Sequence, residues 1–473
     1  MKRLRLSNSI YKDILIAFIG IAPLILLFNA TFSIPLIISF LIQILLIIVF
    51  AYIILYIDIE NIANICVFIF FYLFFIVSPI IQFLINKYTL INTMPFNEVS
   101  AFYTNIVTSI FLLFYILFYT YFLKNKGKNQ HNKELTILQF YKSPNLSTLS
   151  ILFTVSLFST FIATSEIIEK ISFLNIIISQ ESEETSILLL KKKVLYNFPF
   201  ATLLYLVAMR RNFAPNIFIV TLLLILMILI TKNPLLEKRN GLGPTYLLLL
   251  YLLFHKYLIS NQILLSVFLL LFIIFFPISS IFTHSSIYGW GNILSYRTID
   301  IIISHFSQLH FDAWSNLTAT LEYVHQYNFT FGNQLLGTFL FFFPRSMWPN
   351  KPIPSGVEIG NYLINNHGMW FNNLSNPIVA EAYIDFGIPG IILYSIILSY
   401  VVFKLGTYII QKNNLIIRNA AIYTSISLIF ILRGSLMPAF AYICGSLFTI
   451  VLIPILITNL TSKITAKAFI FKK

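Results

Sequence analysis

Five basic residues have side chains that could bind one anion together, in a chain where charged residues make up only 10% of the sequence. They are Arg239, Arg297, Arg345, Lys351 and Arg433. A guanidinium group binds phosphate oxygens through two parallel donors, so four arginines favour a phosphate or, above all, a pyrophosphate ligand. Arg433 is the clearest case, because it lies between two apolar runs, where an ionisable residue is costly and usually functional. The alternative for each residue is snorkelling to lipid phosphate.

The segment FFFPRSMWPNKP at 341–352 combines two of these cations with repeated prolines. Four prolines between positions 344 and 354 fix the backbone φ, which predicts a stiff, extended segment from which Arg345 and Lys351 project. Trp348 offers an aromatic face that suits a membrane interface or a sugar ring. The alternative interpretation is a proline-rich lid that packs on a helical bundle.

Two carboxylates follow this segment at a spacing that places them on one face of a helix. The residues Ser375-Asn376-Pro377 are typical of a helix start. Glu381 and Asp385 are then predicted to share one face of the helix that begins there, with Glu381 about 6 Å from its start. The glycines and proline at 387–390 predict a kink in the same helix.

The motif HFDAW at 310–314 supplies a further imidazole and a further carboxylate, His310 and Asp312. The 7 histidines show no spacing that is typical of a metal site. Both cysteines lie inside apolar runs, where they are predicted to fill buried space. We therefore expect no metal and no cofactor.

The composition of the chain indicates what class of protein carries these residues. The chain has 473 residues, of which 58% are hydrophobic and 10% charged, whereas a soluble protein carries roughly a quarter charged residues. Apolar runs long enough to cross a hydrocarbon core of about 30 Å recur along the sequence. We predict an all-α polytopic membrane protein that forms a single domain over 1–473. About twelve spans are expected, near 14–30, 32–57, 62–85, 99–123, 147–165, 196–209, 213–231, 244–259, 262–281, 377–403, 419–437 and 438–458.

An even number of spans places both termini on one side of the membrane. With the termini inside, the inner segments hold 19 of the 31 lysines and arginines, which predicts a cytoplasmic N- and C-terminus. Residues 282–376 then form one large periplasmic loop. The net charge of +14 is explained by cytoplasmic segments, so no nucleic-acid partner is expected. Residues 166–195 are predicted to lie along the membrane surface.

The chain resembles the O-antigen polymerase (oligosaccharide repeat-unit polymerase, Wzy-type) family. The resemblance covers about a fifth of the sequence and rests on HFD at 310–312, the region of Gly332, PRSMWPNKP at 344–352, Gly356, Gly360 and EAYIDFG at 381–387. An arginine followed by a glycine after ten to fifteen residues is a loop pattern of that family, and Arg345 meets it with either Gly356 or Gly360. KRNGLG at 238–243 is similar to a basic element of relatives but departs from their Gly-Ser-Arg wording.

The resemblance implies a fold similar to that of GT-C-type lipid-linked glycan transferases. It implies that a growing glycan is transferred from undecaprenyl pyrophosphate to a new lipid-linked repeat unit at the periplasmic face of the bacterial inner membrane. Donor and acceptor would both be undecaprenyl-pyrophosphate-linked oligosaccharides, within membrane lipid, and a chain-length-regulator membrane protein is a possible partner. The basic residues would stabilise the pyrophosphate leaving group. Glu381 is the first candidate for the base, with Asp385, His310 and Asp312 as further candidates.

Two other functions fit the same pattern. An O-antigen ligase-like enzyme would use the same donor with a different acceptor, so the sequence does not separate it from a polymerase. A lipid-linked oligosaccharide flippase or other transporter would also have many spans. Transporters, however, usually carry paired half-repeats and charged or broken helices at mid-membrane, whereas the polar residues here gather in one loop.

Overall fold

Every regular element that the structure describes is a helix. The computed structural model describes residues 2–58, 61–85, 97–129, 144–173, 190–209, 217–234, 239–258, 260–275, 277, 297–410 and 414–470. The chain divides into two compact units, and each is described here by itself. Unit 1 comprises Met1–Lys124, Phe254–Gly406 and Leu428–Phe440. Unit 2 comprises Asn125–Leu253, Thr407–Ser427 and Ala441–Lys473.

Unit 1 contains all the loop residues that the sequence singled out, apart from Arg239. Its helices lie wholly or mostly within the unit and are α1 (Lys2–Phe28), α2 (Ile34–Tyr52), η1 (Ile53–Ile57), α3 (Ile62–Phe71), η2 (Tyr72–Val77), α4 (Ser78–Leu84), α5 (Glu98–Asn129), α11 (Asn261–Leu270), η7 (Leu271–Phe275), α13 (Arg297–His305), η9 (Leu309–Phe311), α14 (Ala313–Tyr327), α15 (Asn333–Phe339), α16 (Ser355–His367) and α17 (Ile378–Ile410). The end of α18 (Leu415–Arg433) and the start of α19 (Leu436–Leu447) also belong to it.

Unit 2 is a smaller set of helices joined by hydroxyl and amide contacts. It contains α6 (Leu146–Phe173), η4 (Leu190–Val194), η5 (Leu195–Asn197), α8 (Phe198–Met209), α9 (Ile217–Thr231), α10 (Arg239–Phe254), η10 (Phe448–Leu452), α20 (Ile453–Ile470) and the remaining parts of α18 and α19. Helices α6 and α8 meet through Ser156 and Thr202, whose hydroxyl oxygens are 2.8 Å apart. The predicted surface segment at 166–195 begins as the end of α6, and Lys191 forms an ion pair with Glu166; its middle lies outside the described residues.

By helix length and hydropathy the chain is a multi-pass membrane protein. Among the described residues, eight helices are long and apolar enough to cross a membrane: Ser9–Phe28, Ile34–Ile57, Ile62–Leu84, Glu98–Asn125, Leu146–Ile168, Ile378–Ile410, Leu415–Arg433 and Leu436–Lys463. The other four predicted spans coincide with the shorter helix α8 and the apolar helices Ile217–Thr231, Gly241–Phe254 and Asn261–Phe275.

The continuous helix Ile62–Leu84 is the core of unit 1, because its most apolar 18-residue stretch is entirely buried. A helix that is apolar on all sides is stable only when other elements surround it. Phe68 packs edge-on against Phe50 of α2 at 5.5 Å between ring centroids, and Phe71 lies 5.6 Å from Phe111 of α5. The π-helical stretch η2 interrupts this helix, and such bulges frequently occur at functional sites.

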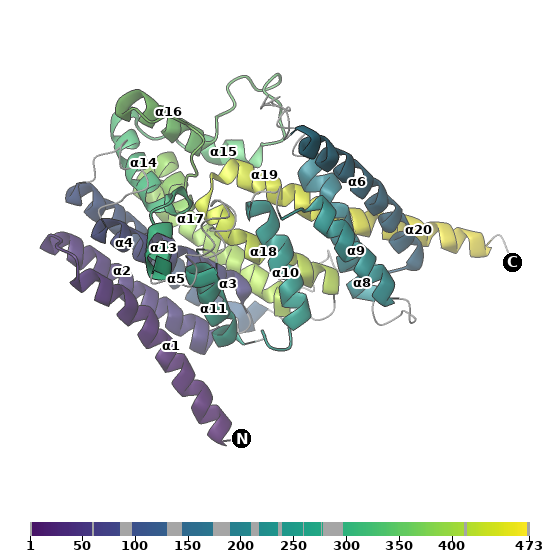
Figure 1. Cartoon of the computed structure of the whole chain (residues 1–473), viewed down its shortest axis with the longest axis horizontal. Helices are drawn as coiled ribbons and strands as arrows, with labels where there is room; N and C mark the ends of the chain where they lie inside the picture. Colours follow the sequence, from purple (N-terminus) through teal and green to yellow (C-terminus); the bar gives the residue numbers. More distant parts are fainter. Residues whose placement is uncertain are drawn as a thin grey trace. The chain divides into compact units, whose positions relative to one another are not determined.

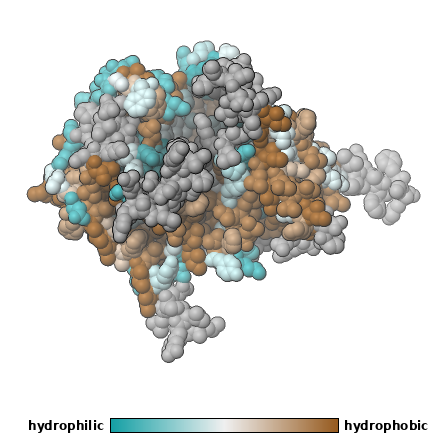
Figure 2. Space-filling model, in the orientation of Figure 1, coloured by the Kyte–Doolittle hydropathy of each residue, from teal (hydrophilic) through white to brown (hydrophobic). Residues whose placement is uncertain are grey.

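The loop predicted over 282–376 contains helices α13, η9, α14, α15 and α16 in its described part, residues 297–376, with turns between them. Figure 1 shows α14 and α16 together at one end of unit 1. They share an apolar core that contains Val324 and Ile359 and reaches Ile384 of α17. In Figure 2, hydrophilic residues gather at this end of the unit, while hydrophobic residues cover the side formed by α1. The loop is therefore a small folded layer over one end of the membrane helices.

Helix α14 extends this layer into the membrane helices of unit 1. Trp314 is 1% exposed, and its indole nitrogen donates to Oδ1 of Asn105 on α5 at 2.9 Å. Thr318 and Thr104 bring their hydroxyl oxygens to 2.9 Å, again between α14 and α5. Because unpaired polar groups are expensive to bury, these matched pairs fix α14 against α5.

The extended backbone predicted for residues 344–352 was wrong. The amides of Met347 and Trp348 both donate to the carbonyl oxygen of Pro344, at 3.1 Å, and the amide of Lys351 donates to that of Trp348 at 3.0 Å. The prolines exclude a regular helix, but Pro349 occupies the second position of a four-residue turn, where proline is favoured. Proline here therefore produces consecutive turns.

The predicted kink in α17 is confirmed. Gly387 has φ 64° and ψ −140° inside the helix. A Cβ atom at this position would also lie 2.8 Å from Cζ of Phe329, so both the backbone conformation and the close approach require glycine. The kink separates the first two turns of α17, which carry Glu381 and Asp385, from the rest of the span.

Cysteine labelling tests the predicted orientation of the loop. Asn365 and Asn373 are exposed in the loop, and Lys256 is exposed in a segment predicted to be cytoplasmic. In a background with Cys66→Ala and Cys444→Ala, we expect Asn365→Cys and Asn373→Cys to react with an impermeant thiol reagent in intact spheroplasts. Lys256→Cys should react only after the membrane is broken. The reverse pattern would place the loop in the cytoplasm and contradict the topology.

Candidate functional site

Arg433 and Asp312, both singled out from the sequence, form an ion pair. The Nη2 atom of Arg433 lies 2.9 Å from Oδ1 of Asp312, and it also donates to the carbonyl oxygen of Leu309 at 2.7 Å. The Asp312 side chain is 4% exposed and that of Arg433 27% exposed. Arg433 ends α18, where a cation interacts favourably with the helix dipole. The pair therefore joins the end of a membrane span to the HFDAW segment.

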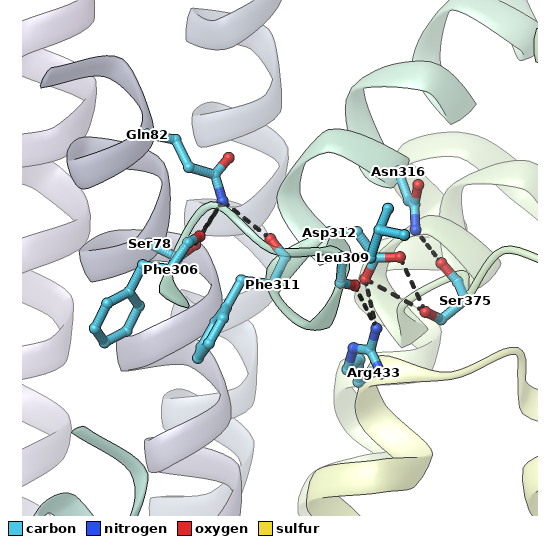
Figure 3. Close-up of polar contacts among 9 residues, drawn as sticks. All are labelled: Ser78, Gln82, Phe306, Leu309, Phe311, Asp312, Asn316, Ser375 and Arg433. Carbon is cyan, nitrogen blue, oxygen red and sulfur yellow. Dashed lines mark hydrogen bonds and ion pairs between the residues drawn. The ribbon is translucent and has the colours of Figure 1, made fainter. Parts of the chain in front are cut away.

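The HFDAW segment is held from its other side by the central helix. Figure 3 shows Ser78 and Gln82 on one side of residues 306–312 and Arg433 on the other. Gln82 Nε2 donates to the carbonyl oxygens of Phe306 at 2.8 Å and Phe311 at 3.2 Å. These contacts fix the backbone around His310 and Asp312 without using the side chains of either residue.

A chain of polar contacts leads from Asp312 to Glu381. Ser375 Oγ donates to both carboxylate oxygens of Asp312, at 3.3 and 3.2 Å. The next residue, Asn376, donates to Ser355 Oγ at 3.1 Å, and Ser355 Oγ donates to Oε1 of Glu381 at 2.5 Å. The segment that precedes α17 thus connects the ion pair to the carboxylate of Glu381.

Glu381 also holds the junction between α18 and α19. It is 2% exposed, and its Oε1 accepts a second hydrogen bond from the amide of Leu436 at 2.8 Å. The adjacent Ser435 accepts a hydrogen bond from the amide of Gly356 at 2.9 Å. Oε2 of Glu381 accepts no hydrogen bond from the described residues. This carboxylate therefore has one oxygen in use and one available.

Gly356 and Gly360 are required by close packing of α16. A Cβ atom at Gly356 would lie 2.0 Å from the carbonyl oxygen of Leu374, and one at Gly360 would lie 2.2 Å from that of Asn372. Both glycines therefore let α16 lie directly on the segment before α17. The pattern of Arg345 followed by Gly356 or Gly360 thus has a physical reason at its two glycines. They allow α16 to pack closely, and this packing places Ser355 beside Glu381.

Asp385 lies in a different environment from Glu381. Its two oxygens accept four hydrogen bonds: from Thr330 at 2.6 Å, from the amides of Gln334 at 3.2 Å and Leu335 at 3.1 Å, and from Tyr394 at 2.6 Å. A carboxylate offers about four lone-pair sites, so all are in use. The two amides belong to the first turn of α15, so Asp385 caps that helix from α17. This geometry suits a structural role.

Arg345 and Lys351 satisfy backbone carbonyl groups of their own turn. Arg345 donates to the carbonyl oxygens of Lys351 at 2.7 Å and Pro352 at 3.1 Å. Lys351 Nζ donates to those of Phe341 at 2.5 Å and Phe343 at 3.0 Å. Partial burial and then the nearby Arg345 charge lower the pKa of the Lys351 ammonium. Trp348 is half-buried in the same turn. Arg345 itself is exposed and keeps further N–H donors.

The other predicted site residues are His310, Arg297 and Arg239. His310 is half-buried, with its ring centroid 5.9 Å from that of His305. Arg297 begins α13, and Arg239 begins α10 in unit 2, but the side chains of both lie outside the described residues. Within the residues described, no group of three or more His, Cys, Asp or Glu side chains is arranged to hold a metal ion.

Several residues of the network were missed in the sequence. Ser355 and Ser435 are single serines with no pattern around them. Asn376 was interpreted as a helix cap, yet its side chain bonds Ser355 and also accepts from Thr320 at 3.2 Å. The pair Ser78 and Gln82 did carry a signal, because two polar residues one helical turn apart inside an apolar run must find partners in the protein.

Comparison with protein-family models, curated proteins and solved structures finds no match to this chain. The chemistry of the site must therefore be argued from its own geometry. The contact network joins one arginine, two carboxylates and three hydroxyl groups at the end of a membrane bundle. Such a set can hold an anion and accept a proton at Glu381.

The structural role of Asp385 can be tested by stability. Asp385→Asn places an amide NH₂ group among four donors, so we expect a loss of about 1–3 kcal/mol in the free energy of unfolding. Thermal unfolding of the purified protein in detergent would show this loss as a lower midpoint. Asp300→Asn, at an exposed acid in α13, is the matched control and should shift stability by less than about 0.5 kcal/mol. Equal midpoints for both variants would contradict the capping role.

A double-mutant cycle tests the Arg433–Asp312 pair. Arg433→Gln leaves a buried carboxylate without its cation, and Asp312→Asn leaves the guanidinium without its anion, so each should destabilise by about 3–5 kcal/mol. The double variant should be clearly more stable than the sum of the two losses predicts. Denaturant unfolding of the reconstituted protein provides the measurement. Additive losses would show that the two side chains do not interact in the folded protein.

Proposed function

We propose that this protein is a membrane glycan transferase that joins undecaprenyl-pyrophosphate-linked oligosaccharide repeat units, as O-antigen polymerases do. The observation that carries the proposal is the polar contact network that runs from Arg433 through Asp312 to Ser375, and from the adjacent Asn376 through Ser355 to Glu381. It supports transfer chemistry because it combines an anion-binding cation with a carboxylate that has one available oxygen. The resemblance in the motifs at 344–352 and 381–387 supports the same function.

In the proposed reaction the acceptor sugar hydroxyl gives its proton to Oε2 of Glu381. Its oxygen forms a bond to the anomeric carbon of the donor glycan. The bond from that carbon to the pyrophosphate oxygen breaks, and the electron pair leaves with the pyrophosphate. Negative charge therefore grows on the leaving group, and guanidinium groups fixed beforehand stabilise it. No metal or cofactor is required for this balance of atoms and charges.

Glu381 is the best base among the three predicted carboxylate candidates because of the hydrogen bonds that each accepts. Asp385 accepts four hydrogen bonds, and Asp312 accepts one from Arg433 and two from Ser375. Only Glu381 among the three carboxylates has an oxygen with no partner in the described part of the chain. Ser355 and the Leu436 amide hold its other oxygen, so the carboxylate is oriented before substrate binds.

The leaving group can be held by arginine donors that the described contacts leave unused. The Nε atom of Arg433 is buried without a hydrogen-bond partner among the described residues. Arg345 is exposed, and both its terminal nitrogens are already fixed by backbone carbonyls. A rigid guanidinium loses less conformational entropy on binding an anion. We propose the periplasmic face of the bacterial inner membrane as the place of the reaction.

Gene disruption and complementation test this proposal. Loss of a polymerase should leave surface polysaccharide with single repeats on a gel, loss of a ligase should leave bare core, and loss of a flippase should leave the lipid intermediate inside the cell. Complementation with Glu381→Gln keeps the size of the side chain but removes the base, so we expect polymer formation to fall about a hundredfold or more.

The matched control is Glu358→Gln, on α16 in the loop that precedes α17. Glu358 accepts hydrogen bonds from Tyr323 at 2.6 Å and Gln334 at 2.7 Å but lies outside the proposed reaction. Its variant should support polymer at near wild-type level once protein amounts are matched. Wild-type polymer from Glu381→Gln, at equal protein amount, would refute Glu381 as the base. Bare core or trapped lipid intermediate after gene disruption would refute the polymerase assignment itself.

A further inference from the structure

The loop carries an exposed apolar surface that is outside every candidate membrane span. We define the aromatic wedge as residues 331–347, which comprise α15 and the turn that follows it. Its exposed members include Phe331 (77% exposed), Phe342 (63%) and Met347 (73%). Leu336 and Phe339 of α15 are also exposed. Large apolar side chains that are exposed together usually mark a surface that meets a partner or a membrane.

The depth of the aromatic wedge follows from its contacts with α19. The ring centroid of Phe440 lies 5.8 Å from that of Phe339 and 6.0 Å from that of Phe341. Gly337 packs between Pro352 and Met437, because an added Cβ would lie 2.5 Å from Pro352 Cγ and 2.7 Å from Met437 Cε. Leu436 begins a candidate span, so Phe440 lies about 6 Å inside it. The wedge is therefore level with the first turn of a membrane helix.

In residues 341–352, carbonyl groups outside a regular helix receive hydrogen bonds from side chains, as a weakly polar environment requires. A non-helical segment at membrane depth must satisfy its carbonyl groups within the protein, because lipid offers no donors. Lys351 donates to the carbonyl oxygens of Phe341 and Phe343, and Arg345 donates to those of Lys351 and Pro352. Side chains thus supply donors to four carbonyl groups that a helix would otherwise have satisfied.

The charge of the segment fits a phospholipid surface. Residues 331–354 contain Arg345 and Lys351 and no Asp or Glu. Basic side chains next to an apolar surface can bury their stems in lipid and direct their charged ends to the phosphate groups. A soluble protein partner would not require the satisfied carbonyl groups or the position level with α19.

We propose that the aromatic wedge inserts into one leaflet of the bilayer, at the boundary between headgroups and acyl chains. The apolar side chains of Phe331, Phe342 and Met347 contact acyl chains, and Arg345 and Lys351 lie at the level of the lipid phosphates. The wedge is thereby an interfacial anchor for the loop. This inference depends only on the membrane class of the protein and is independent of the proposed reaction.

Nitroxide accessibility tests the insertion. The full-length protein with Cys66→Ala and Cys444→Ala would be reconstituted into vesicles of phosphatidylethanolamine and phosphatidylglycerol. Spin labels are placed at Phe342→Cys and Met347→Cys. The reference for lipid is Leu45→Cys, 63% exposed on α2, and the reference for water is the exposed loop residue Asn365→Cys. Power saturation then gives the accessibility of each label to oxygen and to a water-soluble nickel chelate.

We expect the oxygen-to-nickel ratio at Phe342 and Met347 to be severalfold higher than at Asn365 and to approach that at Leu45. A ratio equal to that at Asn365 would overturn the proposal, because the wedge would then face water. Low accessibility to both reagents would also overturn it, since a protein partner or a second copy would then cover the wedge. Labels at Phe331→Cys and Leu336→Cys form a second pair, so one poorly folded variant does not leave the question open.

Discussion

The carboxylate of Glu381 joins three helices, and the rest of the candidate site depends on this contact. Its Oε1 atom accepts hydrogen bonds from Ser355 of α16 and from the Leu436 amide at the start of α19. The part-buried amide of Leu436 belongs to a helix N-terminus and needs such an acceptor. With α16 held there, Ser355 also meets Asn376, and the segment before α17 then reaches Asp312 and Arg433. One buried acceptor thus determines where the loop meets the membrane helices.

The central helix Ile62–Leu84 is the second constraint, because polar groups fix it at both ends. At its start, Asn61 and Tyr119 form a hydrogen bond of 2.7 Å, and the Tyr119 hydroxyl donates to Asp58 at 2.5 Å. At its end, Gln82 donates to the carbonyl oxygens of Phe306 and of Phe311, which belongs to the HFDAW segment. The two ends are about 34 Å apart if the helix is regular, which is roughly the thickness of a bilayer core. A fully apolar helix could slide along its axis or rotate about it. A helix that is fixed at both ends does neither, so it sets the height and the orientation of the loop that Gln82 contacts.

The features of the fold that follow from local pattern could be predicted from the sequence, whereas the partners of the site residues could not. The membrane class follows from long apolar runs, and the kink follows from Gly387, because each depends on neighbouring residues. The pairing of Arg433 with Asp312 joins residues 121 positions apart, and neither residue contains information about the other. Asp385 is a carboxylate on the same predicted helix face as Glu381, so the sequence alone does not distinguish it from a general base. Only the tertiary approach of α15 reveals that its oxygens are all in use. The turn at 344–352 was misread because proline excludes a helix but does not choose between an extended segment and a turn.

The basic residues of the loop and of the membrane span differ in whether a carboxylate neutralises them. Arg433 is paired with Asp312, so its charge is neutralised in a partly buried place where an isolated charge would be costly. Arg345 and Lys351 bond only to backbone carbonyl groups in the described contacts, which leaves their full charges uncompensated by any carboxylate there. In the proposed reaction, the pyrophosphate would therefore gain more from Arg345 and Lys351 than from the neutralised pair, and Arg433 would offer only its Nε atom, which has no hydrogen-bond partner among the described residues. The uncompensated charges of the turn and the neutralised pair at the end of the span thus match the different roles that the proposal gives them.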